Sequence, residues 1–224
     1  MTARQKSRPP KRILIVDDHP MMREGLAQLI ANEPAWAVCG EAGDAHEALD
    51  KVAALKPDLV LTDISLPAKS GLELIKDVQA MHPGVFILVL SMHDESLYVE
   101  RVLRAGARGY VMKQEGGKKI AQAIRDVLDG KISVSEKMSA KILEIFSGRR
   151  DEAAGSPVEK LTDREFEVLQ LIGQGLDTKQ LAEKLCLSTK TVEAHRANIK
   201  TKLKLATMSE LIRYAVRWVE SEKS

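Results

Sequence analysis

Residues 11–25 read KRILIVDDHPMMREG, and this stretch carries the pattern from which the fold can be deduced. The apolar run Ile13–Val16 ends in two adjacent carboxylates, Asp17 and Asp18, and the chain turns at Pro20 before a stretch of helical period. Side chains of like charge repel each other, so an acid pair at the end of an apolar run points to a bound cation. Taken alone, the pair is equally compatible with a helix cap.

The same order of segments recurs along the first half of the chain: a short apolar run rich in β-branched residues, then turn residues, then a stretch of helical period. The apolar runs are Ile13–Val16, Trp36–Cys39, Leu59–Leu61, Val85–Leu90 and Gly109–Met112. The helical stretches are Met21–Ala31, Ala45–Leu55, Leu72–Met81, Ser96–Ala105 and Lys118–Leu128. Fully apolar runs separated by helices are typical of parallel strands covered on both faces. Residues 11–130 are therefore predicted to form a doubly wound α/β domain with a five-stranded parallel sheet.

Beyond Lys131 the strand pattern stops. Residues 131–148, KISVSEKMSAKILEIFSG, are compatible with a helix, and residues 149–160, RRDEAAGSPVEK, are polar with one Gly and one Pro, as linkers often are. We therefore expect a helical and flexible linker over residues 131–157. Residues 1–10 are expected to form a disordered basic tail.

Residues 158–224 have helical period throughout. Thr162 with Glu165 has the spacing of a capping box, and Asp177 with Gln180 resembles a second one. Three or four short helices in this length predict a small all-α domain, so the chain is expected to contain two domains.

The composition of the 224 residues fits this division and excludes some classes of protein. No apolar run approaches the roughly 20 residues of a membrane-spanning helix, and the basic N-terminus lacks the apolar stretch of a signal peptide. We expect a cytoplasmic protein that does not enter a membrane. Cys39 and Cys186 stand alone, which argues against a zinc site or a disulfide framework, and both are expected to be small buried apolar side chains.

Positive charge is concentrated near the end of the chain, although the net charge is only +2. Residues 188–204 contain a single acid, Glu193, and a group of cations: Lys190, Arg196, Lys200, Lys202 and Lys204. Such a cluster is either the solvated face of a helix or a surface that binds a polyanion.

Three carboxylates follow predicted strands, Asp17 and Asp18 after the first and Asp63 after the third. In a doubly wound sheet the first and third strands can be neighbours at the switch point, which brings the three side chains to one place. Oxygen ligands with room for water suit Mg²⁺, which proteins usually hold with one or two carboxylates together with phosphate oxygens.

Two further strand ends complete the predicted pocket: Ser91 follows VFILVL, and Lys113 follows GYVM. A hydroxyl can hydrogen-bond a phosphoryl oxygen, and an ammonium group offsets the charge of the acids. Together with the carboxylates they predict a site for a phosphoryl group held by a carboxylate and a metal ion. His19, next to the acid pair, is expected to shape the loop.

Residues 11–130 resemble the receiver domain of two-component response regulators. The resemblance rests on four motifs in order: the acid pair DD, the acceptor in LVLTDISLP, the hydroxyl in LVLSM and the lysine in GARGYVMK. It implies a flavodoxin-like fold and a sensor histidine kinase as the partner that donates the phosphoryl group.

The resemblance also implies a role for each residue of the pocket. Asp63 would be the phosphoacceptor, and Asp18 and Asp63 would bind Mg²⁺ directly while Asp17 acts through water. The backbone carbonyl of Ser65 would be a further ligand of the metal.

The remaining residues of the pocket would form the switch. Lys113 and Mg²⁺ would neutralise the transferring oxygens, and Ser91 would move to bond the new phosphoryl group. Tyr110 matches the switch aromatic of the family, whose ring would swing inward as Ser91 moves.

Residues 161–205 resemble the LuxR-type helix-turn-helix domain, so the whole chain resembles a response regulator of the NarL/FixJ type. The marks are LTDRE at the start of the first helix, LAEKL in the scaffold helix and STKTVEAHRANIKTKL as the recognition helix. At about 100° per residue, Val192, Ile199 and Leu203 share one side of that helix and are expected to be buried.

The opposite side of the recognition helix is small and polar and is expected to enter the major groove of double-stranded DNA. The residues expected to contact bases or phosphates are Lys190, Thr191, Glu193, Ala194, Ala197, Asn198, Lys200, Thr201 and Lys202. The positions of His195 and Arg196 near the buried side are equally compatible with packing, with a contact to the DNA backbone and with reading of bases. The last helix, from about Met208 to Trp218, is expected either to pair two DNA-binding domains or simply to pack on its own domain.

These observations predict a phosphorylation-controlled transcription regulator and not an enzyme in the ordinary sense, although a receiver supports its own phosphoryl transfer and hydrolysis. Unphosphorylated, the receiver would contact the helical domain and limit its access to DNA. Phosphorylation would favour release and formation of a homodimer, and RNA polymerase is a further expected partner.

Two rival functions remain open from the sequence. A magnesium-dependent phosphohydrolase of the haloacid-dehalogenase type needs an Asp two residues beyond its nucleophile, but His19 and Pro20 stand two residues after Asp17 and Asp18. That class also needs a cap domain, for which the sequence offers no region. The second rival is a DNA-binding protein whose receiver works without phosphorylation.

Overall fold

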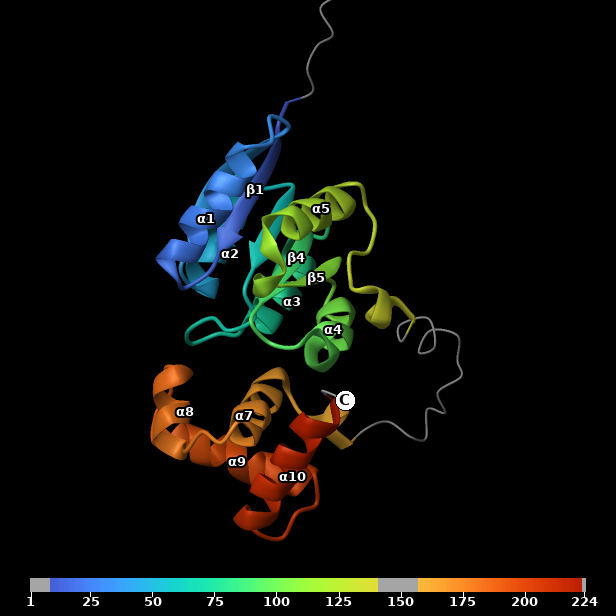
Figure 1. Cartoon of the computed structure of the whole chain (residues 1–224). Helices are drawn as coiled ribbons and strands as arrows, with labels where there is room; N and C mark the ends of the chain where they lie inside the picture. Colours follow the sequence, from blue (N-terminus) through green and yellow to red (C-terminus); the bar gives the residue numbers. More distant parts are fainter. Residues whose placement is uncertain (1–8, 141–156, 223–224) are drawn as a thin grey trace, which may run out of the picture.

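A computed structural model of the chain describes residues 9–140 and 157–222. The described residues form a sheet domain and a helical domain, which lie one below the other in Figure 1. The predicted basic tail lies almost wholly outside the described residues.

The sheet domain contains a parallel sheet of five strands in the order β2-β1-β3-β4-β5. The strands are β1 (Lys11–Val16), β2 (Trp36–Ala42), β3 (Leu59–Thr62), β4 (Phe86–Ser91) and β5 (Gly109–Met112). The helices are α1 (Pro20–Ala31), α2 (Ala45–Leu55), α3 (Gly71–Met81), α4 (Glu95–Arg104) and α5 (Gly116–Leu128), with the short 3₁₀ helix η1 (Lys113–Glu115) before α5. The doubly wound fold predicted from the sequence is confirmed.

Helices cover both faces of the sheet (Figure 1). Ile30 of α1 and Ile124 of α5 pack on the face formed by Ile13 and Ile15, whereas α2, α3 and α4 cover the opposite face. Burial of both faces explains why the strands read as continuous apolar runs. Each fully buried side chain of this kind contributes about 1.5–3 kcal/mol.

The helical domain contains η3 (Pro157–Lys160), α7 (Asp163–Gly173), α8 (Thr178–Lys184), α9 (Thr189–Lys202) and α10 (Met208–Glu222). Thr162 and Glu165 form the predicted capping box at the start of α7. Gly175, with φ of 89°, follows the end of α7 in the left-handed conformation that favours glycine. A Cβ on Gly173 would lie 2.6 Å from the carbonyl oxygen of Ala215, so this glycine allows α10 to pack closely on α7.

Several details differ from the sequence-based expectations. The second strand extends to Ala42, which pairs with Val16 of β1, and the register of the two strands shifts between Ile13 and Leu14. Residues 136–140 of the linker are helical, in agreement with the expected helix, and residues 141–156 lie outside the described part. Cys186 is exposed and Cys39 is only partly buried, so the expectation of two buried cysteines is wrong; both thiols are free.

No helix among residues 9–140 and 157–222 is long and apolar enough to cross a membrane.

Candidate functional site

The acidic pocket lies at the carboxyl edge of the sheet, where β1 and β3 end side by side. Val16 lies opposite Thr62 in the parallel register, so the residues that follow them, Asp17 and Asp63, are brought together. The amide of Asp63 donates to the carbonyl of Val16 at 2.9 Å, which fixes the end of β3 against β1. Both acids are buried.

Lys113 connects the two buried acids. Its Nζ lies 2.6 Å from Asp17 Oδ2 and 2.7 Å from Asp63 Oδ2, and its side chain is only 3% exposed. Burial raises the pKa of the Asp63 carboxyl, an effect that the Lys113 ammonium opposes. Burial alone would lower the pKa of Lys113, but the neighbouring carboxylates of Asp63 and Asp17 outweigh it and raise that pKa. Lys113 is therefore held in its charged form.

The acids also form a group that fits a metal ion. Asp17, Asp18, His19 and Asp63 each offer a ligand atom, and these atoms lie within 4.8 Å of one another. Asp18 is the accessible member of the acid pair, with a side chain that is 37% exposed. Carboxylate oxygens partly open to water are the donors that Mg²⁺ prefers.

His19 is closer to this group than the sequence indicated. Its amide donates to Asp17 Oδ1 at 2.9 Å, and its Nδ1 lies 2.6 Å from Asp18 Oδ1. The sequence signal was only its position beside the acid pair, before the Pro20 that begins α1.

Gly71 keeps the loop after Asp63 in place. Its amide donates to the carbonyl of Ile64 at 2.7 Å. A Cβ at this position would collide with the carbonyl oxygen of Asp63 and would lie 2.8 Å from Ile64 Cα, so only glycine fits here without a shift of the backbone. Nothing in the spacing of the sequence indicated this close approach.

The residues of the implied switch meet at His93, which the sequence did not single out. Ser91 Oγ accepts a hydrogen bond from the His93 amide at 3.1 Å, and the Tyr110 hydroxyl donates to the His93 carbonyl at 2.7 Å. Ser65 Oγ lies 2.8 Å from His93 Nε2. The Tyr110 ring is buried in this structure, with 2% of the residue exposed.

The recognition helix α9 has the two sides that its sequence predicts. Val192 and Ile199 are fully buried, and Leu203, at the end of the helix, is 9% exposed. The exposed members of the predicted DNA-contacting set are Lys190, Glu193, Ala194, Ala197, Asn198 and Thr201.

The remaining members of that set are partly buried and already have partners. Thr191 Oγ1 lies 2.7 Å from Ser188 Oγ at the start of α9. Lys200 donates to the carbonyl of Ala206 at 3.2 Å, and Lys202 pairs with Glu165 at 2.6 Å. These contacts direct Lys200 and Lys202 toward their own domain.

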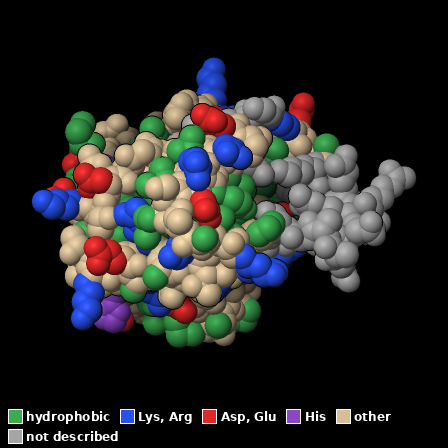
Figure 2. All heavy atoms as spheres, turned by 90° about the horizontal axis from the view of Figure 1, so that it is seen from below, with side chains coloured by type: hydrophobic (Ala, Val, Ile, Leu, Met, Phe, Trp, Pro, Cys, Tyr) green, Lys and Arg blue, Asp and Glu red, His purple; other side chains and the backbone are tan. Residues whose placement is uncertain are grey.

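His195 and Arg196 also lie toward the protein. Arg196 contacts the Thr178 hydroxyl at the start of α8, and His195 lines a cavity between the two domains. This geometry favours packing for both residues. Figure 2, which views the molecule from the side of the helical domain, shows basic side chains interspersed with acidic and apolar ones.

The sheet domain holds the helical domain through α4. Arg101 donates to the carbonyl of Val158 at 2.6 Å and to that of Leu161 at 3.1 Å. Its guanidinium also lies 4.0 Å from the centre of the Phe166 ring in α7, a cation–π arrangement.

Two further contacts join the domains. Lys76 of α3 pairs with Asp163 at 2.6 Å, and Arg164 donates to the carbonyl of Ala68 at 3.3 Å. Ala68 belongs to the loop that follows Asp63, so the helical domain touches both α4 and that loop. The exposed side of α9 is not covered by this contact.

Comparisons with known proteins agree with both halves of this description. A family model described as the response regulator receiver domain matches residues 13–125, and one described as bacterial regulatory proteins, luxR family, matches residues 159–215. Oxygen regulatory protein NreC of Staphylococcus aureus (strain JH9) is 38% identical over 210 residues, covering 92% of this chain and 97% of that protein. NreC of Staphylococcus haemolyticus is 36% identical over 210 residues with the same coverage.

The solved structures that resemble this chain are also response regulators. RcsB from Salmonella enterica serovar Typhimurium, bound to promoter rprA in the presence of the phosphomimetic BeF3-, has a TM-score of 0.62 and 26% sequence identity, covering 92% of this chain and 98% of that chain. A LuxR-family two-component response regulator from Aurantimonas sp. is 36% identical with a TM-score of 0.57, covering 62% of this chain and 99% of that one.

Proposed function

The chain belongs to the response regulators that join a receiver domain to a LuxR-family DNA-binding domain, and on this premise we propose that Asp63 is its phosphoacceptor. The observation that carries the proposal is the lysine bridge: Lys113 contacts both Asp17 and Asp63 at the carboxyl edge of the sheet. A buried ammonium beside the acceptor is suited to the negative charge of a transferring phosphoryl group.

The metal in this proposal is Mg²⁺, held by Asp18 and Asp63, with Asp17 acting through water and the backbone carbonyl of Ser65 as a further ligand. The grouping of carboxylate oxygens at the pocket supports the choice. When bound, Mg²⁺ would neutralise charge on the phosphoryl oxygens. His19 lies at the edge of the same group and would hold the acid pair in position.

The proposed reaction uses the carboxylate of Asp63 as nucleophile. An oxygen of Asp63 attacks the phosphorus of a phosphohistidine on a sensor histidine kinase, the phosphorus–nitrogen bond breaks, and the electron pair stays on the histidine nitrogen. Lys113 keeps its proton and bonds the phosphoryl oxygens, while Ser91 turns its hydroxyl to the product. Water later attacks the same phosphorus, the bond between phosphorus and the Asp63 oxygen breaks, and inorganic phosphate leaves. The carboxylate is restored, so the receiver also resets itself.

The output of the switch is binding to double-stranded DNA through α9. The relative RcsB has been seen as dimers bound to DNA, and we propose that phosphorylation likewise favours a homodimer of this chain on two half-sites. The exposed residues Lys190, Glu193, Ala194, Ala197, Asn198 and Thr201 would face the major groove. Thr191, Lys200 and Lys202 would reach the DNA only after leaving their present partners.

The contact between the domains favours control by docking over direct blocking of DNA. The side of α9 that would face DNA is exposed, so the receiver does not cover that side in this structure. The expectation that the receiver limits the access of the helical domain to DNA stays a prediction. Trp218 of α10 instead packs on Phe166 and lines the cavity beside α4. We propose that docking restrains α10, and that phosphorylation releases it for pairing.

The proposed domains are a receiver over residues 11–130, a linker over 131–157 and a DNA-binding domain over 158–224. A regulator that binds DNA acts at the bacterial chromosome, so we propose that this protein is cytoplasmic. RNA polymerase is a further proposed partner at the promoter.

Phosphorylation and DNA binding measured on the same samples test this function. The intact chain is incubated with acetyl phosphate and Mg²⁺, its mass is measured, and its affinity for DNA selected from a random pool is determined. We expect the mass of one phosphoryl group and a tighter, dimeric DNA complex, and neither in Asp63→Ala. Equal DNA affinity and dimerisation in Asp63→Ala and the parent would contradict the switch and favour a receiver that works without phosphorylation.

A further inference from the structure

His93 lies between the acceptor pocket and the contact with the helical domain. On the pocket side, its backbone binds both residues of the proposed switch: the amide donates to Ser91 Oγ at 3.1 Å and the carbonyl accepts from the Tyr110 hydroxyl at 2.7 Å. Its imidazole Nε2 lies 2.8 Å from the Ser65 hydroxyl, two residues after Asp63. One residue thus joins the loop after β3, the end of β4 and the ring on β5.

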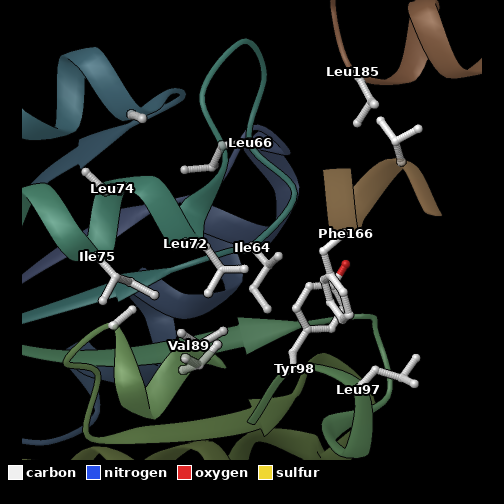
Figure 3. Close-up of a cluster of buried hydrophobic side chains, with 14 of the residues drawn as sticks. Ile64, Leu66, Leu72, Leu74, Ile75, Val89, Leu97, Tyr98, Phe166 and Leu185 are labelled. Atoms are coloured by element: carbon white, nitrogen blue, oxygen red, sulfur yellow. The ribbon is translucent and has the colours of Figure 1, made fainter. Parts of the chain in front are cut away.

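On its other side, the His93 ring begins a row of aromatic side chains that crosses from one domain to the other. The centre of the His93 ring lies 5.1 Å from that of Tyr98 on α4, and Tyr98 lies 5.2 Å from Phe166 on α7. Phe166 in turn lies 5.3 Å from Trp218 on α10. The last two pairs meet edge to face, an arrangement that fixes the relative orientation of the rings. Figure 3 shows Tyr98 and Phe166 in contact at the boundary of the domains.

Tyr98, in the middle of this row, is held by packing on the receiver side. Tyr98 is fully buried, and its hydroxyl has no hydrogen-bond partner among the residues that the structure describes. Ring packing rather than a hydrogen bond therefore holds Tyr98 against Phe166. A contact held by packing depends on how closely the rings fit, so a small displacement of Tyr98 weakens it.

We propose that His93 is a positioning residue that transmits a change at the acceptor pocket to Tyr98, and through Tyr98 to the docked helical domain. The proposal rests on the function proposed above, because it takes phosphorylation of Asp63 as the change that is transmitted.

The step follows from the hydrogen bonds of His93. When Ser91 turns its hydroxyl toward Asp63, its Oγ moves away from the His93 amide. Ser65, beside the acceptor, and Tyr110 still hold the imidazole and the carbonyl, so the loop that carries His93 shifts toward the pocket as one piece. Asp94, the next residue, caps α4 through the amide of Ser96, so the first turn of α4 and the Tyr98 ring follow. Two arrangements of α4 and its loop, one docked and one released, are then favoured by different states of Asp63.

The fluorescence of Trp218 measures this transmission in the full chain. The protein has two tryptophans, so Trp36→Phe leaves Trp218 as the single reporter at the domain contact. In that background, His93→Phe keeps an aromatic ring next to Tyr98 but removes the bond to Ser65, and Ser65→Ala removes the same bond from its other end. Met92→Ala is the matched control, because Met92 is the neighbouring residue in the loop and its side chain is largely exposed.

Each variant is treated with acetyl phosphate and Mg²⁺, and the change in Trp218 emission is divided by the fraction phosphorylated in the same sample. We expect a red shift in the parent and in Met92→Ala as Trp218 leaves the contact. His93→Phe should be phosphorylated like the parent and yet show less than half of that shift. Ser65→Ala should show the same loss per phosphorylated molecule, and the double variant no more than either single one.

Different failures are distinguishable. A full shift in phosphorylated His93→Phe and Ser65→Ala would overturn the role of His93 and leave the proposed function standing. If His93→Phe folds but takes up no phosphoryl group, His93 acts in the transfer itself and the positioning role is wrong. A phosphorylated parent without any shift would contradict the proposed release, and this inference with it.

Discussion

At the scale of single residues, the pocket depends on the charge of Lys113 and on the absence of a side chain at Gly71. Lys113 separates two buried carboxylates that would otherwise repel each other, and it contacts both. Gly71 gives the acceptor loop a position that no side chain would allow. Lys113 therefore balances the charge of the carboxylates, whereas Gly71 fixes the position of the loop beside them.

Substitution of Gly71 tests the second of these conditions. In Gly71→Ala the new Cβ would collide with the backbone of Asp63 and Ile64, and backbone atoms cannot give way as a flexible side chain does. We expect a loss of about 1–3 kcal/mol in the free energy of unfolding, as for an overpacked site, and slower uptake of phosphoryl groups by Asp63. Denaturant titration and a time course with acetyl phosphate measure the two effects.

Gly25→Ala is the matched control. Gly25 lies in α1 and has open space where the Cβ would stand, so alanine should leave phosphorylation unchanged and stabilise the helix by up to about 1 kcal/mol. An equally fast reaction in Gly71→Ala and Gly25→Ala would mean that the loop tolerates the extra atom.

Much of the pocket was predictable at this scale, because each of its charged groups stands at the end of an apolar run. Parallel strands end at one edge, so Asp17, Asp63 and Lys113 were expected together, and the structure brings them together. His93 was not predictable, because its role depends on a side-chain bond to Ser65 across 28 positions of the sequence, and a histidine in a loop carries no pattern. The metal and switch roles of the individual residues stay predictions.

At the scale of elements, the caps of the helices tie the DNA-binding domain together. Thr162 and Glu165 bond each other reciprocally at the start of α7, and the same Glu165 carboxylate pairs with Lys202 at the end of α9. The sequence predicted the capping box from its spacing. It did not predict the ion pair, since Lys202 was expected to face DNA.

The helix cap at Thr162 makes a measurable contribution to the free energy of unfolding. Thr162→Ala removes the side-chain oxygen that accepts from the amide of Glu165, so we expect a loss of about 1 kcal/mol in the stability of the DNA-binding domain. Thr162→Ser, which keeps the hydroxyl, should restore most of it. Thermal unfolding of the three proteins decides whether the hydroxyl carries the effect.

Glu165 contributes to the pH dependence of the free energy of unfolding. Burial would raise the pKa of this carboxyl, but bonds from Lys202 and from the amide of Thr162 outweigh it and lower the pKa below the usual 4.5. Because the folded pKa is lowered, the contribution is fully present above about pH 4.5 and is lost as the pH falls through the folded value. Glu165→Gln should remove this part of the acid dependence. Unfolding curves between pH 3 and 7 that fall in parallel for both proteins would assign the dependence to other groups.

At the scale of the whole molecule, the receiver and the DNA-binding domain are packed through α4, α7 and α10, and the side of α9 proposed to face DNA stays exposed. The sequence predicted two domains but not this arrangement, because the contact is made by backbone carbonyls and by rings distant in the chain. Carbonyl groups at Val158 and Leu161 leave no signal in the identity of their residues. The sequence motifs therefore do not indicate how the two domains are coupled, whereas the contact between them does.

Arg101 offers a way to weaken that contact without touching either functional surface. Its hydrogen bonds to Val158 and Leu161 involve a charged donor and are worth about 1.5–3 kcal/mol each. Arg101→Ala should therefore shift docking at least about tenfold toward separated domains. We expect dimerisation and tighter DNA binding without acetyl phosphate.

Arg104→Ala provides the comparison, since Arg104 lies on the same helix but pairs with Glu100 within α4. Sedimentation velocity and DNA titration of both variants separate the effect of docking from that of lost charge. Parent-like behaviour of Arg101→Ala would mean that the contact does not restrain the DNA-binding domain.

We propose that a phosphoryl group on Asp63 loosens the contact between α4 and the DNA-binding domain. Hydrogen exchange of the backbone amides in residues 95–105 and 157–166 measures that contact directly, with and without acetyl phosphate and Mg²⁺. We expect faster exchange in both segments of the phosphorylated chain and no change in Asp63→Ala. Unchanged exchange in both segments, in a sample whose mass shows that Asp63 is fully phosphorylated, would mean that phosphorylation does not loosen this contact.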